Sequence, residues 1–236
     1  MTDARQRWRV HVARGPAARD VPHRDILAAW EAGLSEAGLP LVLTEGRHPQ
    51  PRVVFAAPVP VGMLADREPV DLWLTDLRRI HEVRSAVEAA MPDGHLLVDL
   101  YDVWIGAPSL PASVAAGDYV VAAHPATVSG TPGPLATLAA DAAGAGDSML
   151  AATLIARERS KGGGTVAVDI RPHILSLAVA AAGYGTALEL ELRLLLGGER
   201  GVGRPEEVLA ELGDRLGTEL IADQIVRRRV VLSDEP

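Results

Sequence analysis

One short segment gathers the side chains most suited to binding an ionic ligand. Between two short apolar runs, residues 41–43 and 53–55, the chain reads Glu45-Gly46-Arg47-His48-Pro49-Gln50-Pro51-Arg52. The two prolines fix their own φ angles and restrict the residues before them, so the segment is stiff. It is either a binding loop for a polar or anionic ligand, or an Ω-type connection whose Arg and Glu side chains satisfy each other.

A histidine and a carboxylate open the first predicted helix, residues 22–37. His23 and Asp25 lie where the unpaired amides of a helix start favour anions. His23 suits a general base or an anion contact, with His48 and Arg52 nearby if the charged loop folds over the helix. The alternative is a His–Asp pair that only caps and orients the helix.

A metal ion is another ligand that these residue types suit. The two histidines and two carboxylates of these segments follow no known metal-ligand spacing, and the chain offers no second signature. The residues in question are His23, Asp25, Glu45 and His48. We therefore expect no metal and no cofactor.

Further candidates lie in the second half of the chain. Asp169 and Arg171 follow a predicted strand, where they form either an ion pair that pins the strand exit or part of a site facing a cleft between domains. Residues 160–164, Ser-Lys-Gly-Gly-Gly, lack the order of a phosphate-binding loop, so we expect a hairpin turn. In the three arginines at 227–229, alternation places the first and third on one strand face. That face must then be polar or paired with acids.

The first half of the chain alternates strand and helix patterns. Residues 7–12 alternate charged and apolar side chains, which predicts a strand with one buried face. The helix at 22–37 has one apolar face and is bounded by a proline and a glycine. The pattern continues with strands at 41–43, 53–55 and 70–74, a helix at 77–90 and a strand at 95–101. We interpret the order as β-α-β-β-α-β, which is ferredoxin-like.

The second half repeats this order more loosely. We expect strands at 118–123, 148–157 and 165–170, a helix at 134–143, a hairpin of 174–181 and 186–195, a helix at 205–212 and a final strand at 221–232. If residues 174–195 are an added hairpin, the remainder is again β-α-β-β-α-β. The sequence thus predicts an α+β fold of two tandem ferredoxin-like domains, residues 1–106 and 107–236, the second with an extra hairpin.

Composition limits the classes of function. The formal net charge of −8 argues against strong non-specific nucleic-acid binding, which depends on phosphate neutralisation. The chain has no cysteine, which excludes disulfides, thiolate nucleophiles and cysteine-ligated zinc or iron–sulfur clusters. No apolar run reaches the ~18–20 residues of a membrane span, and the first residues lack the apolar core of a signal peptide. We expect a cytoplasmic protein with no membrane contact.

A series of short motifs is spread over residues 8–233 in a consistent order and spacing. They are Pro22-His23-Arg24-Asp25-Ile26, Glu45-Gly46, Pro51-Arg52, Pro58-Val59-Pro60-Val61-Gly62, Val168-Asp169-Ile170-Arg171-Pro172 and Arg204-Pro205-Glu206-Glu207. Together they resemble the radical-SAM-linked DUF2344 family. Members of that family are often fused to, or encoded beside, radical SAM proteins, and the tandem ferredoxin-like shape is also similar to the RAMP class of CRISPR RNA-processing proteins.

The chain departs from this family in the charged loop. The family loop usually reads Glu-Gly-Phe-Asn-Pro-His-Pro-Arg, and here Arg47, His48 and Gln50 replace the Phe, Asn and His. If the family binds a ligand through those positions, this chain has a different ligand or none. The helix entry keeps His23 and Asp25.

Two functions follow from these observations. Radical SAM chemistry requires a cysteine-ligated cluster, so the resemblance implies a non-catalytic accessory or substrate-binding partner that serves a radical SAM enzyme in trans. It would present a substrate, such as RNA or a carrier-bound small molecule, in the cleft between its domains. The site would be lined by His23, Asp25, Glu45, Arg47, His48 and Arg52, with Asp169 and Arg171 as further binding residues. The alternative is a RAMP-type RNA-binding or RNA-processing protein with His23 as general base, and a purely structural module is the third possibility.

Overall fold

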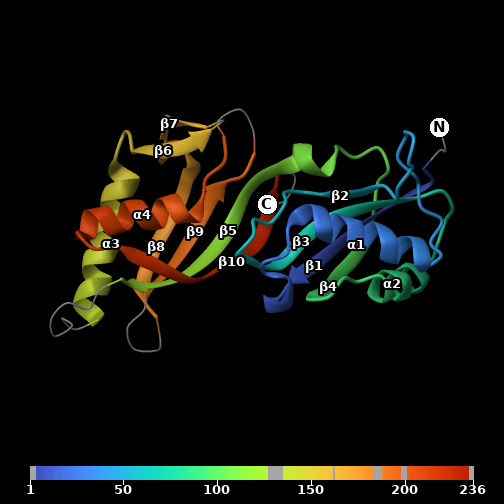
Figure 1. Cartoon of the computed structure of the whole chain (residues 1–236), viewed down its shortest axis with the longest axis horizontal. Helices are drawn as coiled ribbons and strands as arrows, with labels where there is room; N and C mark the ends of the chain where they lie inside the picture. Colours follow the sequence, from blue (N-terminus) through green and yellow to red (C-terminus); the bar gives the residue numbers. More distant parts are fainter. Residues whose placement is uncertain (1–3, 127–134, 162, 183–187, 198–200, 234–236) are drawn as a thin grey trace. The chain divides into compact units, whose positions relative to one another are not determined.

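Helices and antiparallel strands alternate along the chain, which is the mixed α+β class predicted (Figure 1). The computed structural model describes residues 4–126, 135–161, 163–182, 188–197 and 201–233. The chain forms two units, one of Met1–Val114 with Leu232–Pro236 and one of Ala115–Val231. In the described part, no helix combines the length and the apolar character needed to cross a lipid bilayer.

The first unit has two helices and one antiparallel sheet. Its elements are β1 (Gln6–Arg14), α1 (His23–Glu36), β2 (Val53–Phe55), β3 (Leu64–Leu74), α2 (Ile80–Ala89) and β4 (His95–Val103), with short 3-10 turns at Pro16–Ala18 and Leu110–Ser113. The strand order is β4-β1-β3-β2. The described elements therefore follow the order β-α-β-β-α-β.

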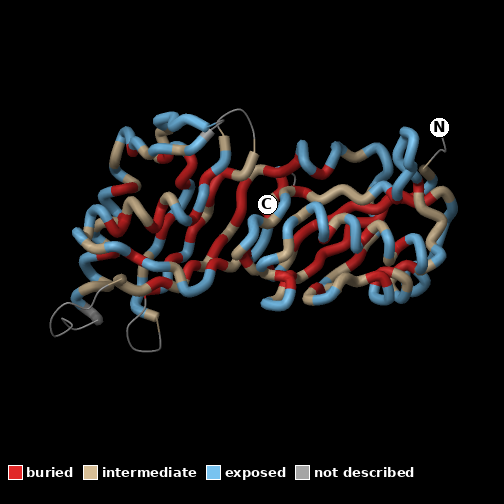
Figure 2. The backbone as a smooth tube through the Cα atoms, viewed as in Figure 1, coloured by how far each residue is buried: buried red, intermediate tan, exposed pale blue. Residues whose placement is uncertain are grey.

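One face of this sheet packs on both helices. Trp8, Val10 and Val12 are alternate residues of β1, so they share a face, and all three are buried. They belong to one apolar cluster with Trp30 of α1 and Val83 of α2. The apolar positions of β1 that the alternation assigned to a buried face are therefore core residues, and the strands of this unit are largely buried (Figure 2).

Two details of this unit differ from the prediction. The intervening residues of β1, including Arg7, Arg9 and His11, are buried as well, so β1 has two buried faces instead of one. Residues 41–43 form no strand, only isolated bridges from Leu41 to Leu74 and from Leu43 to Pro51. The Val42 amide donates to the Trp73 carbonyl of β3 at 2.8 Å and not to residue 52, so the pairing beside Pro51 does not continue as a ladder.

The second unit has two helices, a four-stranded sheet and a separate hairpin. Its elements are β5 (Val114–Pro125), α3 (Leu135–Ala151), β6 (Ala156–Lys161), β7 (Gly164–Asp169), a 3-10 turn (Arg171–His173), β8 (Ile174–Ala181), β9 (Leu188–Leu195), α4 (Pro205–Leu216) and β10 (Leu220–Leu232). The strand order of the sheet is β10-β5-β9-β8, and β6 pairs only with β7. Pro205 begins α4 as predicted, and Gly217 ends it at a φ of 66°.

The extra hairpin of this unit is not the one predicted. It is β6–β7, whereas β8 and β9 belong to the main sheet. The predicted strand at 148–157 is also wrong, because α3 continues to Ala151. Within this helix, a side-chain carbon at Gly146 would lie 3.3 Å from Leu177 of β8. The glycine therefore allows close packing of helix on strand. Residues 134 and 186–187 of the predicted elements lie outside the described residues.

Candidate functional site

The predicted binding loop is a closed turn between two backbone anchors. The Thr44 amide donates to the Gln50 carbonyl at 2.8 Å, and the Gln50 amide donates to Thr44 Oγ1 at 3.0 Å. At the base, the Arg52 amide donates to the Val42 carbonyl at 2.8 Å. These bonds and the two prolines restrict the conformations of the loop, so its side chains are presented from a firm backbone.

The ionic side chains at the tip of this loop point to solvent. Glu45, Arg47 and His48 are all exposed, and within the described residues none of their side chains makes a hydrogen bond or an ion pair. The mutual satisfaction of Arg and Glu that would mark a structural connection is thus not observed there. The loop keeps both charge signs and an imidazole available for a ligand.

Arg52 joins the base of the loop to β3. Its guanidinium lies 4.2 Å from the ring centroid of Trp73, a cation–π distance. The guanidinium of Arg7 lies 5.2 Å from the same centroid. Arg52 is exposed at the surface of the unit, so stacking on Trp73 orients its charge without burying it.

His23 is the first residue of α1 and is half-buried. Its ring meets Phe55 edge-on with centroids 4.9 Å apart. Burial, and then the Arg14 guanidinium, lower the pKa of His23 below its ordinary value, so the imidazole is neutral near pH 7. Asp25 does not pair with it, since this carboxylate bonds Arg24 at 3.1 Å on the surface. The predicted capping His–Asp pair is therefore not formed.

A small pocket beside His23 contains polar residues that the sequence did not single out. Arg14, Glu68 and His95 line it together with His23 and Phe55. The Arg14 guanidinium donates to backbone carbonyls of the turn before α1 and of residue 59, so it orders this corner of the fold. Among the described residues, no hydrogen bond or ion pair joins His23 to the charged loop, so the two predicted halves of one site remain separate features.

Asp169 and Arg171 are structural in this fold, but not as an ion pair. One oxygen of Asp169 accepts from the amides of Ile155 and Arg171 at 2.9 and 3.0 Å. The Arg171 guanidinium instead donates to the carbonyls of Leu150 and Ile174. The predicted carboxylate–guanidinium pair is wrong, because each group satisfies backbone atoms at the ends of neighbouring elements.

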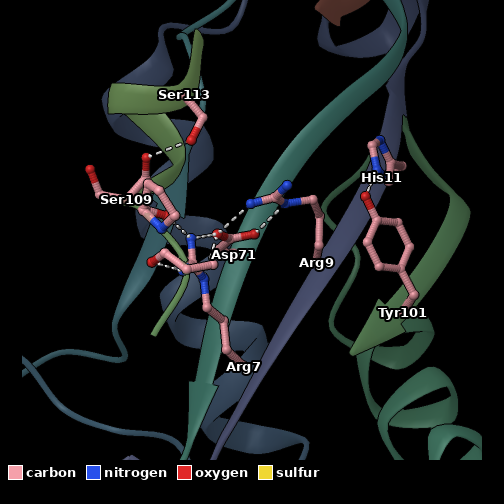
Figure 3. Close-up of polar contacts among 9 residues, drawn as sticks. Arg7, Arg9, His11, Asp71, Tyr101, Ser109 and Ser113 are labelled. Atoms are coloured by element: carbon pink, nitrogen blue, oxygen red, sulfur yellow. Dashed lines mark hydrogen bonds and ion pairs between the residues drawn. The ribbon is translucent and has the colours of Figure 1, made fainter. Parts of the chain in front are cut away.

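The least expected feature is a buried charge cluster on the helix-free face of the first sheet (Figure 3). Arg7 and Arg9 of β1 converge on the Asp71 carboxylate of β3, with Arg7 Nη2 2.5 Å from Oδ2 and Arg9 Nε 2.9 Å from Oδ1. Asp71 is 0% exposed, Arg7 1% and Arg9 6%. Arg7 also donates to the carbonyls of Ala107 and Pro108 at 2.8 and 2.9 Å. The segment after β4 thus covers one end of the cluster.

His11 continues this face. Its Nε2 lies 3.2 Å from the Tyr101 hydroxyl, and the two rings stack at 5.6 Å (Figure 3). Burial, followed by the nearby Arg67 charge, lowers the pKa of His11 to about 4. Its Nδ1 is buried without a hydrogen-bond partner in the described structure. His11 is therefore a neutral imidazole at physiological pH.

Part of this cluster was readable from the sequence. The charged positions of β1 alternate with apolar ones, and Asp71 is out of phase with Val70 and Leu72. The pairing of β1 with β3 then sets Arg9 opposite Asp71. What the pattern lacks is the covering segment after β4, without which these positions look like a solvated face.

The second unit carries a comparable but exposed charge group. Asp118 of β5 accepts from Arg193 of β9 at 2.6 Å and from Arg229 of β10 at 2.9 Å. The Arg193 hydrogen bond, and then Arg229, lower the pKa of Asp118. The acid partner expected for the Arg227–Arg229 stretch is thus present for Arg229, whereas Arg227 is buried.

No three His, Cys, Asp or Glu residues of the described chain lie together in a way that could hold a metal ion. What the arrangement offers is ionic binding by the exposed loop and a neutral histidine at the start of α1. In the buried cluster of Arg7, Arg9 and Asp71, the described contacts hold the charged groups in position and leave no open space for a ligand.

Comparisons with known proteins give a family and several solved structures of similar fold. A family model described as "Uncharacterized protein conserved in bacteria (DUF2344)" matches residues 7–205. No curated protein matches the sequence. Among solved structures, a chain in the crystal structure of a Cbf5–Nop10–Gar1 complex is similar at a TM-score of 0.49 and 12% identity, over 94% of this chain. This chain spans about half of that one, 48% of its length.

Proposed function

Since the chain belongs to the DUF2344 family of bacterial proteins, we propose that it is a non-catalytic accessory or substrate-binding partner of a radical SAM enzyme. In this role it binds in trans, in the cytoplasm, and presents a substrate to the enzyme. The substrate is RNA or a small molecule attached to a carrier. Residues of the loop 44–52 make the first contact with the enzyme and with its substrate.

The observation that carries the proposal is the state of the loop. Three ionizable side chains, Glu45, Arg47 and His48, extend from a backbone that is closed by hydrogen bonds and stiffened by prolines. Keeping such groups fixed and unpaired contributes nothing to folding, but it lowers the entropy lost on binding. Exposed charges in a firm loop are typical of recognition and of rapid, electrostatically guided association.

The absence of cysteine from the sequence assigns the chain the binding role in this partnership. A radical SAM cluster needs thiolate ligands, and this chain contains no thiol to supply them. The cluster must therefore belong to the partner.

We further propose that both units are ferredoxin-like, arranged in tandem. The strand orders β4-β1-β3-β2 and β10-β5-β9-β8 support this, with the β6–β7 hairpin as an insertion in the second. The fold-level analogy to RAMP proteins suggests a second function, which is RNA binding or cleavage with His23 as general base. The observation that favours it is the lowered pKa of His23, which keeps the imidazole neutral and able to accept a proton.

Affinity capture under low oxygen separates these two functions. The tagged chain is recovered from its bacterial host, and the bound proteins and nucleic acids are identified by mass spectrometry and sequencing. A co-purifying radical SAM protein is the expected result. RNA without such a protein, together with RNA cleavage that is lost in His23→Ala, would replace the partner function with the RNA-processing one.

A further inference from the structure

The helix-free face of the sheet in the second unit is a concavity of about 460 Å³ with fixed charges. This volume is in the range of small-molecule sites. Small side chains form part of its floor, including Val120 of β5 and Ser176 and Ala178 of β8. The opposite face of the same strands carries the core, with Val121 and Leu190 fully buried. The concavity is therefore built on rigid, well-packed strands.

Two carboxylates stand in the middle of this floor. Glu191 of β9 lies between Val120 and Ala178 in the strand register, and Glu189 lies between Ala122 and Ala180. All four cross-strand neighbours are apolar, and both carboxylates are exposed. Within the described residues, neither glutamate makes a hydrogen bond or an ion pair. Two like charges on one strand face, about 7 Å apart along the chain, favour a cation between them.

The opposite charge is fixed at the next position of the same face. Arg193 lies two residues beyond Glu191, so it shares that face, yet it bonds the cross-strand Asp118 through Nε and Nη2. Its Nη1 has no partner among the described residues. Because Asp118 also bonds Arg229, one carboxylate faces two guanidinium groups. This end of the concavity carries net positive charge.

We propose that this concavity binds a small zwitterion of the amino acid or peptide class. The ammonium group of the ligand lies at Glu189 and Glu191, and its acid group accepts from the free Nη1 of Arg193. Arg228 of β10 also lines the concavity. Two negative positions followed by a positive one along the same strand face match a ligand with both charges better than a simple cation or anion. The site does not depend on the loop 44–52 or on a radical SAM partner.

Three probes with the same chain length test the charge requirement. They are 5-aminopentanoate, with one charge of each sign, 1,5-diaminopentane, with two positive charges, and glutarate, with two negative charges. Each is titrated at millimolar concentration into the 15N-labelled chain while amide signals are followed. We expect 5-aminopentanoate to shift signals of β5, β8 and β9 and to bind more tightly than either control.

Charge-removing variants locate the contacts. Glu191→Gln and Arg193→Gln should each weaken 5-aminopentanoate binding about tenfold or more, since each removes a charge-assisted hydrogen bond. Glu158→Gln, an exposed carboxylate on β6, is the matched control and should bind as the parent does. Arg193→Gln also removes the ion pair with Asp118 and could destabilise the fold. Glu191 has no partner among the described residues, so Glu191→Gln keeps the test valid if Arg193→Gln is unstable.

Absence of shifts in β5, β8 and β9 with all three probes would overturn the proposal. So would equal binding of 1,5-diaminopentane, or 5-aminopentanoate binding that is unchanged in Glu191→Gln.

Discussion

The two units use the helix-free faces of their sheets in opposite ways. In the first unit, a carboxylate on that face is fully buried between two arginines, and a backbone segment covers Arg7. In the second unit, a carboxylate between two arginines stays partly exposed beside small side chains and unpartnered glutamates. The same three-group pattern therefore orders the fold in one unit and shapes an open surface in the other. Burial, rather than residue type, decides which role it has.

Removal of the buried carboxylate should have the largest effect on stability. Asp71→Ala leaves Arg7 and Arg9 buried without a counter-charge, which costs about 3–5 kcal/mol of unfolding free energy. All four tryptophans lie at positions 8, 30, 73 and 104, so tryptophan fluorescence during urea unfolding reports on the first unit. A loss below about 1 kcal/mol would show that water reaches the two arginines and that the faces do not differ as described.

Protonation of His11 should have the second largest effect on the free energy of unfolding. Its folded pKa is about 4, below the ordinary 6.5, so protons bind the unfolded chain first. Stability is full above pH 6.5 and falls as the pH drops toward about 4, by up to about 3 kcal/mol. Urea midpoints across this window should decline less in His11→Phe than in the parent. Identical declines would mean that His11 is hydrated in the folded state.

An ion pair of intermediate burial joins the β6–β7 hairpin of the second unit to α4. Arg159 of β6 bonds both oxygens of Glu207 on α4 at 2.5 and 2.6 Å, and both side chains are about 15% exposed. Glu207→Gln should cost about 1–2 kcal/mol, because the charge-assisted pair becomes a neutral one. Hydrogen exchange should increase in β6 and β7 while α1 and α2 stay unchanged. Unchanged exchange in the hairpin would show that it is held by other contacts.

Removal of Asp118, the partly exposed counterpart of Asp71, should have the smallest effect on stability. Asp118→Ala removes a carboxylate whose two arginine partners are more than 40% exposed, so the expected cost is about 1 kcal/mol or less. Urea unfolding followed by circular dichroism measures it. A cost equal to that of Asp71→Ala would contradict the contrast between the two faces.

The features that could be predicted from the sequence are those that depend on the periodicity of apolar residues or on local residue chemistry. Alternation in β1 located Trp8 and Val10 in the core, and the Pro-rich charged loop between residues 44 and 52 was recognised as a distinct feature. The proline at the start of α4 was also found from residue type alone. These features are set by neighbours within a few positions along the chain.

What escaped prediction depends on partners distant in sequence. Arg7 became a core residue because carbonyls a hundred positions later cover it. Asp169 and Arg171 looked like a natural pair, but each is nearer to backbone groups of other elements. The helix predicted to stop at residue 143 continues to Ala151, and its Gly146 packs on Leu177 of β8. None of these contacts leaves a periodic signal in the chain.

The proposed function depends on recognition of a radical SAM partner by the loop 44–52. Its most direct test is low-oxygen affinity capture with a Glu45→Ala/Arg47→Ala/His48→Ala chain, with Glu36→Ala as a control for an exposed charge at the end of α1. These loop side chains have no described partners, so the triple variant should retain the parent's thermal unfolding midpoint. We predict that the parent and the control enrich the same radical SAM protein and that the loop variant loses it. Equal enrichment by the loop variant, or no radical SAM protein with any chain, would contradict the account.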